Sequence, residues 1–262
     1  MKKYILPVCY VIVGFFLIIN LVTEACAFEI GARGYYWFPE LSGDLRVDKN
    51  GIKGTSADLN NDLGIGNESF PSVEVFAGIG KHHVSLMYTQ FHYSGSKVID
   101  KPITFAGLTF DTSALVDSDL KTKMLDLEYQ YDVINLENIL AGFSVGIIGK
   151  LKYLDGEASM RSSTPGSQYN RTETFTAPVP MIGLGMHIGL LKNILEFRVK
   201  GAGIGYADNV FYEALADISL TPFPFLDIHG GYRIMRLKVD DVSDVYSDLK
   251  FYGPYAALTV SF

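Results

Sequence analysis

The last eleven residues of the chain alternate between apolar and small or polar side chains, and they end on an aromatic residue. Leu258, Val260 and Phe262 share one face of this segment, whereas Thr259 and Ser261 share the other. A period of two is the pattern of a β-strand, whose successive side chains point to opposite faces. A strand with one oily face suits the wall of a barrel that has lipid outside and a packed or wet lumen inside.

The other end of the chain has the features of an export signal. A basic start at residues 1–3 precedes an apolar run over 4–22 and the small-residue site Ala25-Cys26-Ala27. This order predicts a signal peptide, residues 1–27, that is cleaved after Ala27 and directs the chain through the Sec pathway. Two alternatives stay open: an uncleaved helical anchor, because the run is long enough to span a bilayer, and lipidation of Cys26.

The composition of the remaining chain, residues 28–262, favours one closed β-barrel domain. No apolar run after residue 27 approaches the ~20 residues that a spanning helix needs, while the sequence contains 16 Tyr, 17 Phe and 26 Gly. Both cysteines, Cys9 and Cys26, precede the domain, so no disulfide holds it. The formal net charge of −7 argues against a nucleic-acid partner.

Ten segments alternate in the manner of strands. We predict an all-β fold, a transmembrane antiparallel up-and-down β-barrel of about ten strands. Eight or twelve strands are also compatible with the sequence, because residues 55–59 could form a strand and residues 59–63 a short helix. The predicted strands are 28–38, 70–80, 83–94, 115–133, 139–160, 174–191, 194–206, 211–221, 225–239 and 246–262.

The connections between these segments differ in length on the two sides. Short connections near residues 80–82, 133–138, 192–193 and 221–224 alternate with mostly longer ones, of which 39–69 is the longest. Transmembrane barrels have tight periplasmic turns and longer outer loops. An even number of strands then places both termini on the periplasmic side.

The more apolar faces of the strands hold almost no charged residues, and the opposite faces hold most of them. A soluble β-sandwich would give the same alternation, and it is the export signal, the terminal Phe262 and the loop lengths that favour the barrel. In that fold the charges line the lumen, where burial is costly unless the signs are paired. They form either an ion-pair network that braces the wall or a narrow aqueous path. The predicted lumen charge network is Glu29, Arg33, Glu74, Asp126, Glu128, Lys150, Lys152, Glu196, Arg198, Lys200, Glu213, Asp217, Asp227 and Arg233.

A second candidate for chemistry is the pair His92 and Ser94, which share a strand face. Some outer-membrane lipid hydrolases use a His and a Ser with this spacing, and a nucleophile needs a base within hydrogen-bond reach. The expected outward orientation of His92 favours a place in the interfacial belt instead. We therefore predict no enzyme, no cofactor and no metal site.

With these features the chain resembles small Gram-negative outer-membrane β-barrel proteins. Tyr255, Val260 and Phe262 match the family's terminal assembly signal, in which Ala257 replaces the usual Gly. The resemblance implies residence in the outer membrane, contact with its lipid and lipopolysaccharide, and insertion by the barrel assembly machinery. It leaves the oligomeric state open.

The expected function is that of a structural barrel or a narrow porin-like channel for small solutes. The alternatives are a surface barrel enzyme that hydrolyses lipid or peptide, and an adhesin that acts through loop 39–69.

Overall fold

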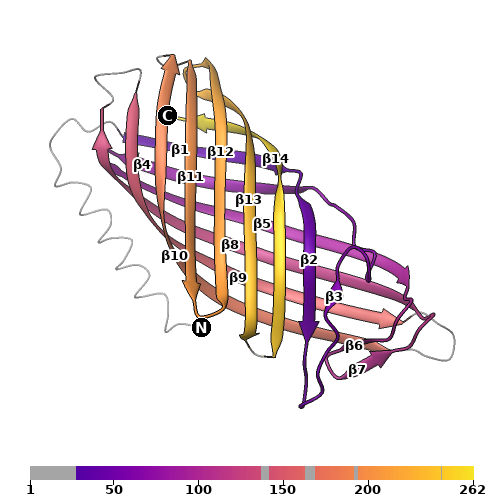
Figure 1. Ribbon diagram of the computed structural model, residues 1–262. Helices are drawn as coiled ribbons and strands as arrows, with labels where there is room; N and C mark the ends of the chain where they lie inside the picture. Colours follow the sequence, from indigo (N-terminus) through magenta and orange to yellow (C-terminus); the bar gives the residue numbers. More distant parts are fainter. Residues whose placement is uncertain (1–27, 137–141, 163–168, 192–193, 243) are drawn as a thin grey trace, which may run out of the picture.

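Ten long antiparallel strands form a closed barrel, as the alternation predicted. The computed structural model describes residues 28–136, 142–162, 169–191, 194–242 and 244–262 (Figure 1). Each barrel strand pairs with the next, and the last one pairs with the first to close the wall. The strands are β1 (Phe28–Trp37), β4 (Phe70–Ile79), β5 (His82–Val98), β8 (Leu115–Asn135), β9 (Phe143–Ser162), β10 (Asn170–Leu191), β11 (Leu195–Tyr206), β12 (Asn209–Phe223), β13 (Leu226–Val242) and β14 (Val245–Ser261).

The described residues contain no helix that could cross a membrane. The predicted signal peptide, residues 1–27, lies outside the described residues and stays a prediction.

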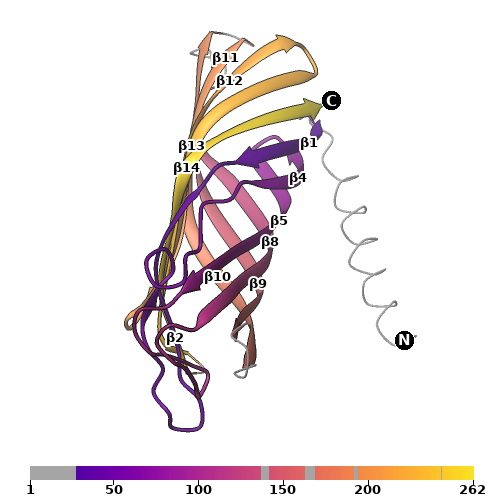
Figure 2. The same cartoon turned by 90° about the vertical axis from the view of Figure 1, so that its right-hand side faces the viewer.

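The two ends of the barrel differ. The start of β1 and the end of β14 lie at one end, which we call the terminus end, together with the turns at residues 80–81 and 224–225 (Figure 2). At the opposite end, the loop end, the connections carry four additional short strands. These are β2 (Glu40–Val47), β3 (Ala57–Asp58), β6 (Ile103–Phe105) and β7 (Leu108–Phe110).

The segment predicted as loop 39–69 is structured. β1 pairs with β14 up to Trp37↔Tyr255, and β2 then continues along the same strand from Glu40↔Tyr252. β2 also pairs with β3, so the strand considered for residues 55–59 exists in a shorter form. β2 therefore extends the wall beyond the point where β1 ends.

The short helix considered for residues 59–63 does not form. The Asp58 carboxylate accepts hydrogen bonds from the backbone amides of Asn60 at 3.0 Å and Asn61 at 2.6 Å. Such local side-chain bonds favour a turn over a helix. The segment ends at Gly64, whose φ of +68° is a conformation that glycine adopts without strain.

Toward the terminus end, the barrel has the polarity of a membrane protein. On β8, Leu125, Leu127 and Tyr129 point outward and are 42%, 48% and 44% exposed. Asp126 and Glu128, between them, point inward and are buried. The same alternation on the neighbouring strands produces a continuous apolar belt around the outside, while the charges lie in the lumen.

Toward the loop end, the polarity is reversed on the same strands. On β8, Lys121 and Lys123 point outward, and their inward neighbours Leu120 and Met124 are buried in an apolar core. β9 repeats the change, because Asp155 is exposed and Leu154 is buried. This half of the barrel is built like a water-soluble β-structure, with an oily interior and a charged surface.

Tyrosines mark the level at which the polarity changes. Tyr88 and Tyr153 lie on either side of Leu125 in adjacent strands, and Tyr252 is paired with Ile234 on the other side of the barrel. Tyrosine is enriched where a membrane meets water, since its ring is apolar and its hydroxyl is polar. The apolar belt therefore ends at this row, and the loop-end half lies beyond it.

Replacing Leu127 with arginine is expected to destabilise the folded barrel in lipid by up to ~2–4 kcal/mol, because it places a charge inside the apolar belt. The measurement is unfolding by denaturant in phospholipid vesicles. The control is Gln90→Arg, which adds the same charge on the outer face just beyond Tyr88. Equal losses in both variants would contradict the position assigned to the belt.

The interior of the loop-end half is filled by aromatic and aliphatic side chains. Phe91 lies at its centre, with ring centroids 5.9 Å from Trp37, 4.9 Å from Phe70 and 5.8 Å from Phe251. The loop segments also contribute, because Leu59, Leu63, Ile65, Ile103, Phe105 and Phe110 are buried in the same cluster. We call this cluster the apolar plug; its larger barrel members include Trp37, Phe70, Phe91, Tyr93, Leu120, Met124, Leu154, Met181, Phe211, Met235, Leu249 and Phe251.

Candidate functional site: the charged lumen

Glu213 on β12 is the hub of the charged lumen. Its carboxylate accepts from Lys150 on β9, lies 3.3 Å from Nζ of Lys152, and lies 2.9 Å from Nη2 of Arg233 on β13. Lys152 is fully buried and also pairs with Asp126 at 2.5 Å. One carboxylate therefore contacts three cations from two parts of the wall, and Asp126 and Glu128 supply further negative charge.

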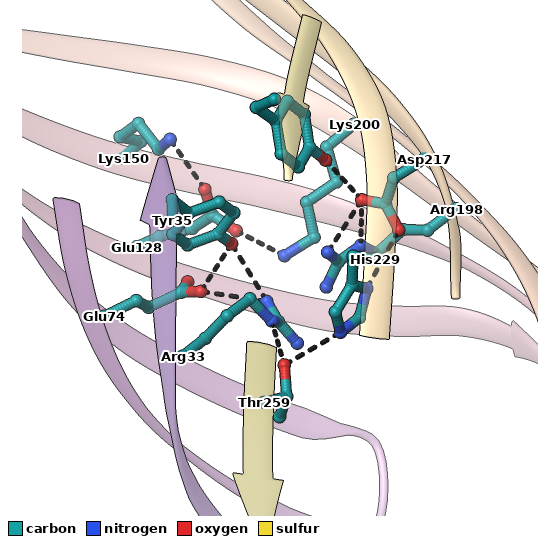
Figure 3. A network of polar contacts seen from close by, with 11 residues as sticks. Arg33, Tyr35, Glu74, Glu128, Lys150, Arg198, Lys200, Asp217, His229 and Thr259 are labelled. Atoms are coloured by element: carbon teal, nitrogen blue, oxygen red, sulfur yellow. Dashed lines mark hydrogen bonds and ion pairs between the residues drawn. The ribbon is translucent and has the colours of Figure 1, made fainter. Parts of the chain in front are cut away.

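Glu128 on β8 extends the network across the barrel. Its two carboxylate oxygens lie 2.8 Å from Nζ of Lys150 and 2.7 Å from Nζ of Lys200 on β11 (Figure 3). Lys150 is thus shared between Glu128 and Glu213. The lysine links the hub to the opposite wall.

Arg33 on β1 holds a second group of contacts. Its guanidinium lies 2.9 Å from Glu74 on β4, and its Nε donates to Thr259 on β14 at 2.6 Å. The Tyr35 hydroxyl donates to the same Glu74 carboxylate at 2.8 Å (Figure 3). These bonds join the first and last strands of the barrel through their side chains as well as their backbones.

Asp217 on β12 anchors the third group. It accepts from Arg198 at 2.8 Å and from the Tyr255 hydroxyl at 2.6 Å, and it lies 3.3 Å from Nδ1 of His229. His229 reaches Thr259 with its other ring nitrogen at 2.8 Å, which connects this group to Arg33 (Figure 3).

The three groups draw side chains from eight of the ten barrel strands into one cross-section of the lumen. Five carboxylates face six lysines and arginines in it. Buried charges are stable only when they are paired and hydrogen-bonded, and here each of these charged groups has at least one ion-pair partner. The geometry agrees with the bracing interpretation of the lumen charges.

Eleven of the fourteen residues predicted for the lumen network lie in this cross-section. The other three, Glu29, Glu196 and Asp227, lie toward the terminus end and line the mouth of a cavity. Glu196 pairs with His187 at 3.1 Å, and Asp227 accepts from the Thr221 hydroxyl at 2.5 Å. They are lumen residues outside the network.

The cavity has a volume of about 630 Å³ and opens at the terminus end. The cross-section of ion pairs forms its deep end, where Arg33, Glu74, Arg198 and Lys200 line it. Beyond that end lies the apolar plug. The lumen therefore consists of a polar vestibule, a layer of ion pairs and an oily core, in that order.

Sequence reasoning from charge alone missed the uncharged members of the network. Tyr35, Tyr255 and Thr259 complete the hydrogen bonds of Glu74, Asp217 and Arg33. All three occupy inward positions of their strands, so the period of two in the sequence could have identified them as lumen residues.

The apolar plug was not predicted from the sequence. The inward faces of the strands are mainly charged in the terminus-end half and mainly apolar in the loop-end half. The alternation assigns a residue to a face, but it does not say whether that face meets lipid or water outside.

The structure places His92 and Ser94 on the outer face of β5. His92 lies 3.1 Å from Asp119 on β8 through Nε2, and both side chains are exposed. The described residues show no hydrogen bond between Ser94 and His92, so a nucleophile–base pair is not assembled there. No group of three or more metal-ligating side chains occurs in the part of the chain that the structure describes.

The residues of the expected assembly signal are divided between the faces of β14. Tyr255 points into the lumen and is buried, whereas Val260 is outward and 40% exposed and Phe262 is 80% exposed. Their recognition by the barrel assembly machinery stays a prediction of the resemblance.

Together, the closed antiparallel wall, the apolar belt and the charged lumen define the class: this is a transmembrane β-barrel of the outer-membrane type. No family model matches the chain. No curated protein matches it either.

The fold of this chain is similar to those of several solved outer-membrane barrels. The translocator domain of the autotransporter NalP from Neisseria meningitidis is 11% identical, with 96% of this chain and 95% of that chain covered and a TM-score of 0.44. Neisserial surface protein A is 14% identical, with 91% and 100% covered and a TM-score of 0.35. Ail, the attachment invasion locus protein of Yersinia pestis, is 14% identical, with 90% and 98% covered and a TM-score of 0.36. With identities and scores this low, no argument about function rests on them.

Proposed function

We propose that this chain is a structural outer-membrane barrel with a sealed lumen, which anchors and displays its loop-end half at the cell surface. In this arrangement the terminus end faces the periplasm and the longer connections face outward. The observation that carries the proposal is the content of the lumen, which holds a layer of ion pairs and, beyond it, the apolar plug.

The sealed version is favoured over the porin-like version by the lining of the lumen. An aqueous path needs polar groups or open space along its whole length. In the loop-end half, Phe91, Tyr93 and Met124 are at most 2% exposed, and the apolar cavity that they line has a volume of only about 40 Å³. Water and solutes that enter the vestibule therefore meet a closed interior.

The same packing limits the surface of segment 39–69 that an adhesin could use to bind a partner. Leu59, Leu63 and Ile65 of the segment 39–69 point into the apolar plug. Only the outer side of this segment is available to a partner, so it serves first to cover the barrel.

Planar-bilayer recording of the refolded barrel tests the sealed-lumen proposal. We expect no unitary current steps above the baseline of the bilayer, because the plug leaves no continuous aqueous path. Heat-modifiable gel mobility of the same sample, which reports a folded barrel, is the control that excludes an unfolded preparation. Reproducible steps from folded protein would contradict the proposal and favour the narrow channel.

A further inference from the structure

The vestibule at the terminus end is lined by charged groups of both signs. Arg33, Arg198 and Lys200 line it together with their carboxylate partners. Glu29 and Asp227 also line it, and neither has a lysine or arginine partner among the described residues. The bracing of the barrel requires the ion pairs, but it does not require these two carboxylates. We therefore considered what the cavity would bind.

At the deep end, two of the three cations are more accessible than the carboxylates that they pair with. The Lys200 side chain is 23% exposed and its partner Glu128 is 10% exposed, whereas Arg198 is 17% exposed and its partner Asp217 is 1% exposed. Arg33 and its partner Glu74 are buried to a similar degree. Lys200 and Arg198 therefore present N–H donors to the cavity in front of their carboxylates.

Some of those donors are not used by the network. Arg198 binds Asp217 through Nε and Nη2, and Arg33 binds its partners through Nε and Nη1. Within the described residues, Nη1 of Arg198 and Nη2 of Arg33 have no hydrogen-bond acceptor. Lys200 makes one bond, to Glu128, with an ammonium group that has three donors. Guanidinium and ammonium donors are the groups that bind a carboxylate most strongly.

At the mouth, the free charge is negative. Glu29 is the second residue of β1 and Asp227 the second residue of β13, so both lie where their strands begin. Neither forms an ion pair with a lysine or arginine among the described residues; Asp227 accepts only from the Thr221 hydroxyl. A carboxylate pair at the entrance attracts a cationic group and repels a free anion.

We propose that the vestibule binds a small zwitterion, a free amino acid or a very short peptide. Its carboxylate contacts Arg33, Arg198 and Lys200, and its ammonium group lies near Glu29 and Asp227. The volume of about 630 Å³ is within the range of small-molecule sites. A simple anion meets like charge at the mouth and a simple cation meets like charge at the deep end, so each is bound less well.

Isothermal titration calorimetry of the folded barrel in detergent micelles tests this proposal with three matched probes. Glycylglycine carries both charges, N-acetylglycylglycine lacks the ammonium group, and glycylglycinamide lacks the carboxylate. We expect saturable binding of glycylglycine and affinities about tenfold lower for the other two, the loss that follows from removing one charge-assisted contact. Equal affinity for all three probes, or binding of none, would overturn the proposal.

Two variants locate the site. Lys200→Gln removes one deep cation while Glu128 keeps Lys150, so the network survives, and glycylglycine affinity is expected to fall about tenfold. Glu29→Gln is expected to weaken glycylglycine but not N-acetylglycylglycine. Lys121→Gln, on the outer surface, is the charge-matched control and should bind like the wild type. If Lys200→Gln is folded and binds glycylglycine as the wild type does, the assignment of the deep end is wrong. This outcome is independent of the conductance test, because a sealed barrel and a conducting one can both have the vestibule.

Discussion

Replacing Glu213 with alanine is expected to lower the free energy of unfolding by about 3–5 kcal/mol, the usual result of breaking a buried ion pair by removing one partner. Lys150, Lys152 and Arg233 all contact this carboxylate, and Lys152 is fully buried. Without it, six network cations face only four carboxylates in the same cross-section. Denaturant unfolding of the refolded barrel in micelles, followed by the fluorescence of Trp37, measures the loss.

The matched control is Glu157→Ala on β9, which removes a carboxylate that pairs with Lys121 at 3.4 Å on the outer surface. Exposed pairs of this kind contribute about 0–1 kcal/mol. If the two variants lose the same stability, the lumen charges do not brace the wall, and the network is of no more consequence than a surface pair.

Replacing Phe91 with alanine is expected to cost a similar amount, about 3–5 kcal/mol, for a different reason. The Phe91 ring is 2% exposed and contacts Trp37, Phe70 and Phe251 from three other strands. Its removal leaves a cavity at the centre of the apolar plug, and the strands that surround it are fixed by their hydrogen bonds and cannot close the space. Unfolding in micelles measures the cost.

Phe38→Ala provides the comparison, because Phe38 is 46% exposed and contacts Tyr36 at the outer surface. The same substitution there should cost less than half as much. Equal costs would mean that the loop-end half does not depend on an oily interior, and that the reversal of polarity has no energetic role.

The ten barrel strands were predictable because each has a period of two over most of its length; a register shift interrupts it in places, as between Asp132 and Ile134 on β8. Some pairs could also be predicted, because Glu128 and Lys150 fall in consecutive predicted strands, 115–133 and 139–160, and the register sets Glu128 opposite Lys150. Of the short strands, β3 lies in the segment 55–59 that was considered as a strand, and it forms over two residues. β2, β6 and β7 were not predicted. β2 depends on pairing with β14 and β3 on pairing with β2, whereas β6 and β7 pair with each other.

Contacts between side chains across the lumen could not be predicted from the sequence. Lys200 meets Glu128 from the opposite wall, 72 residues away in the chain, and this depends on the diameter and stagger of the closed barrel. The reversal of polarity was legible in principle, because Lys121 and Lys123 share a face with Leu125 and Leu127. When each face is classified as apolar or polar over the whole length of a strand, a reversal of polarity halfway along the strand is not detected.

Closure of the barrel by its first and last strands has a consequence for biogenesis. β14 supplies the pairing edge for β1 through residues such as Ser261, opposite Gly31, and for β2 through residues such as Phe251, opposite Leu41. Until β14 is in place, the free edges of β1 and β13 present backbone N–H and C=O groups that have no hydrogen-bond partners. Such unpaired groups are very unfavourable in the hydrocarbon of a membrane. Because these contacts span nearly the whole chain, they are also the slowest to form. Insertion is therefore expected to be all-or-none, with nascent or truncated chains kept out of the bilayer until the final strand is complete.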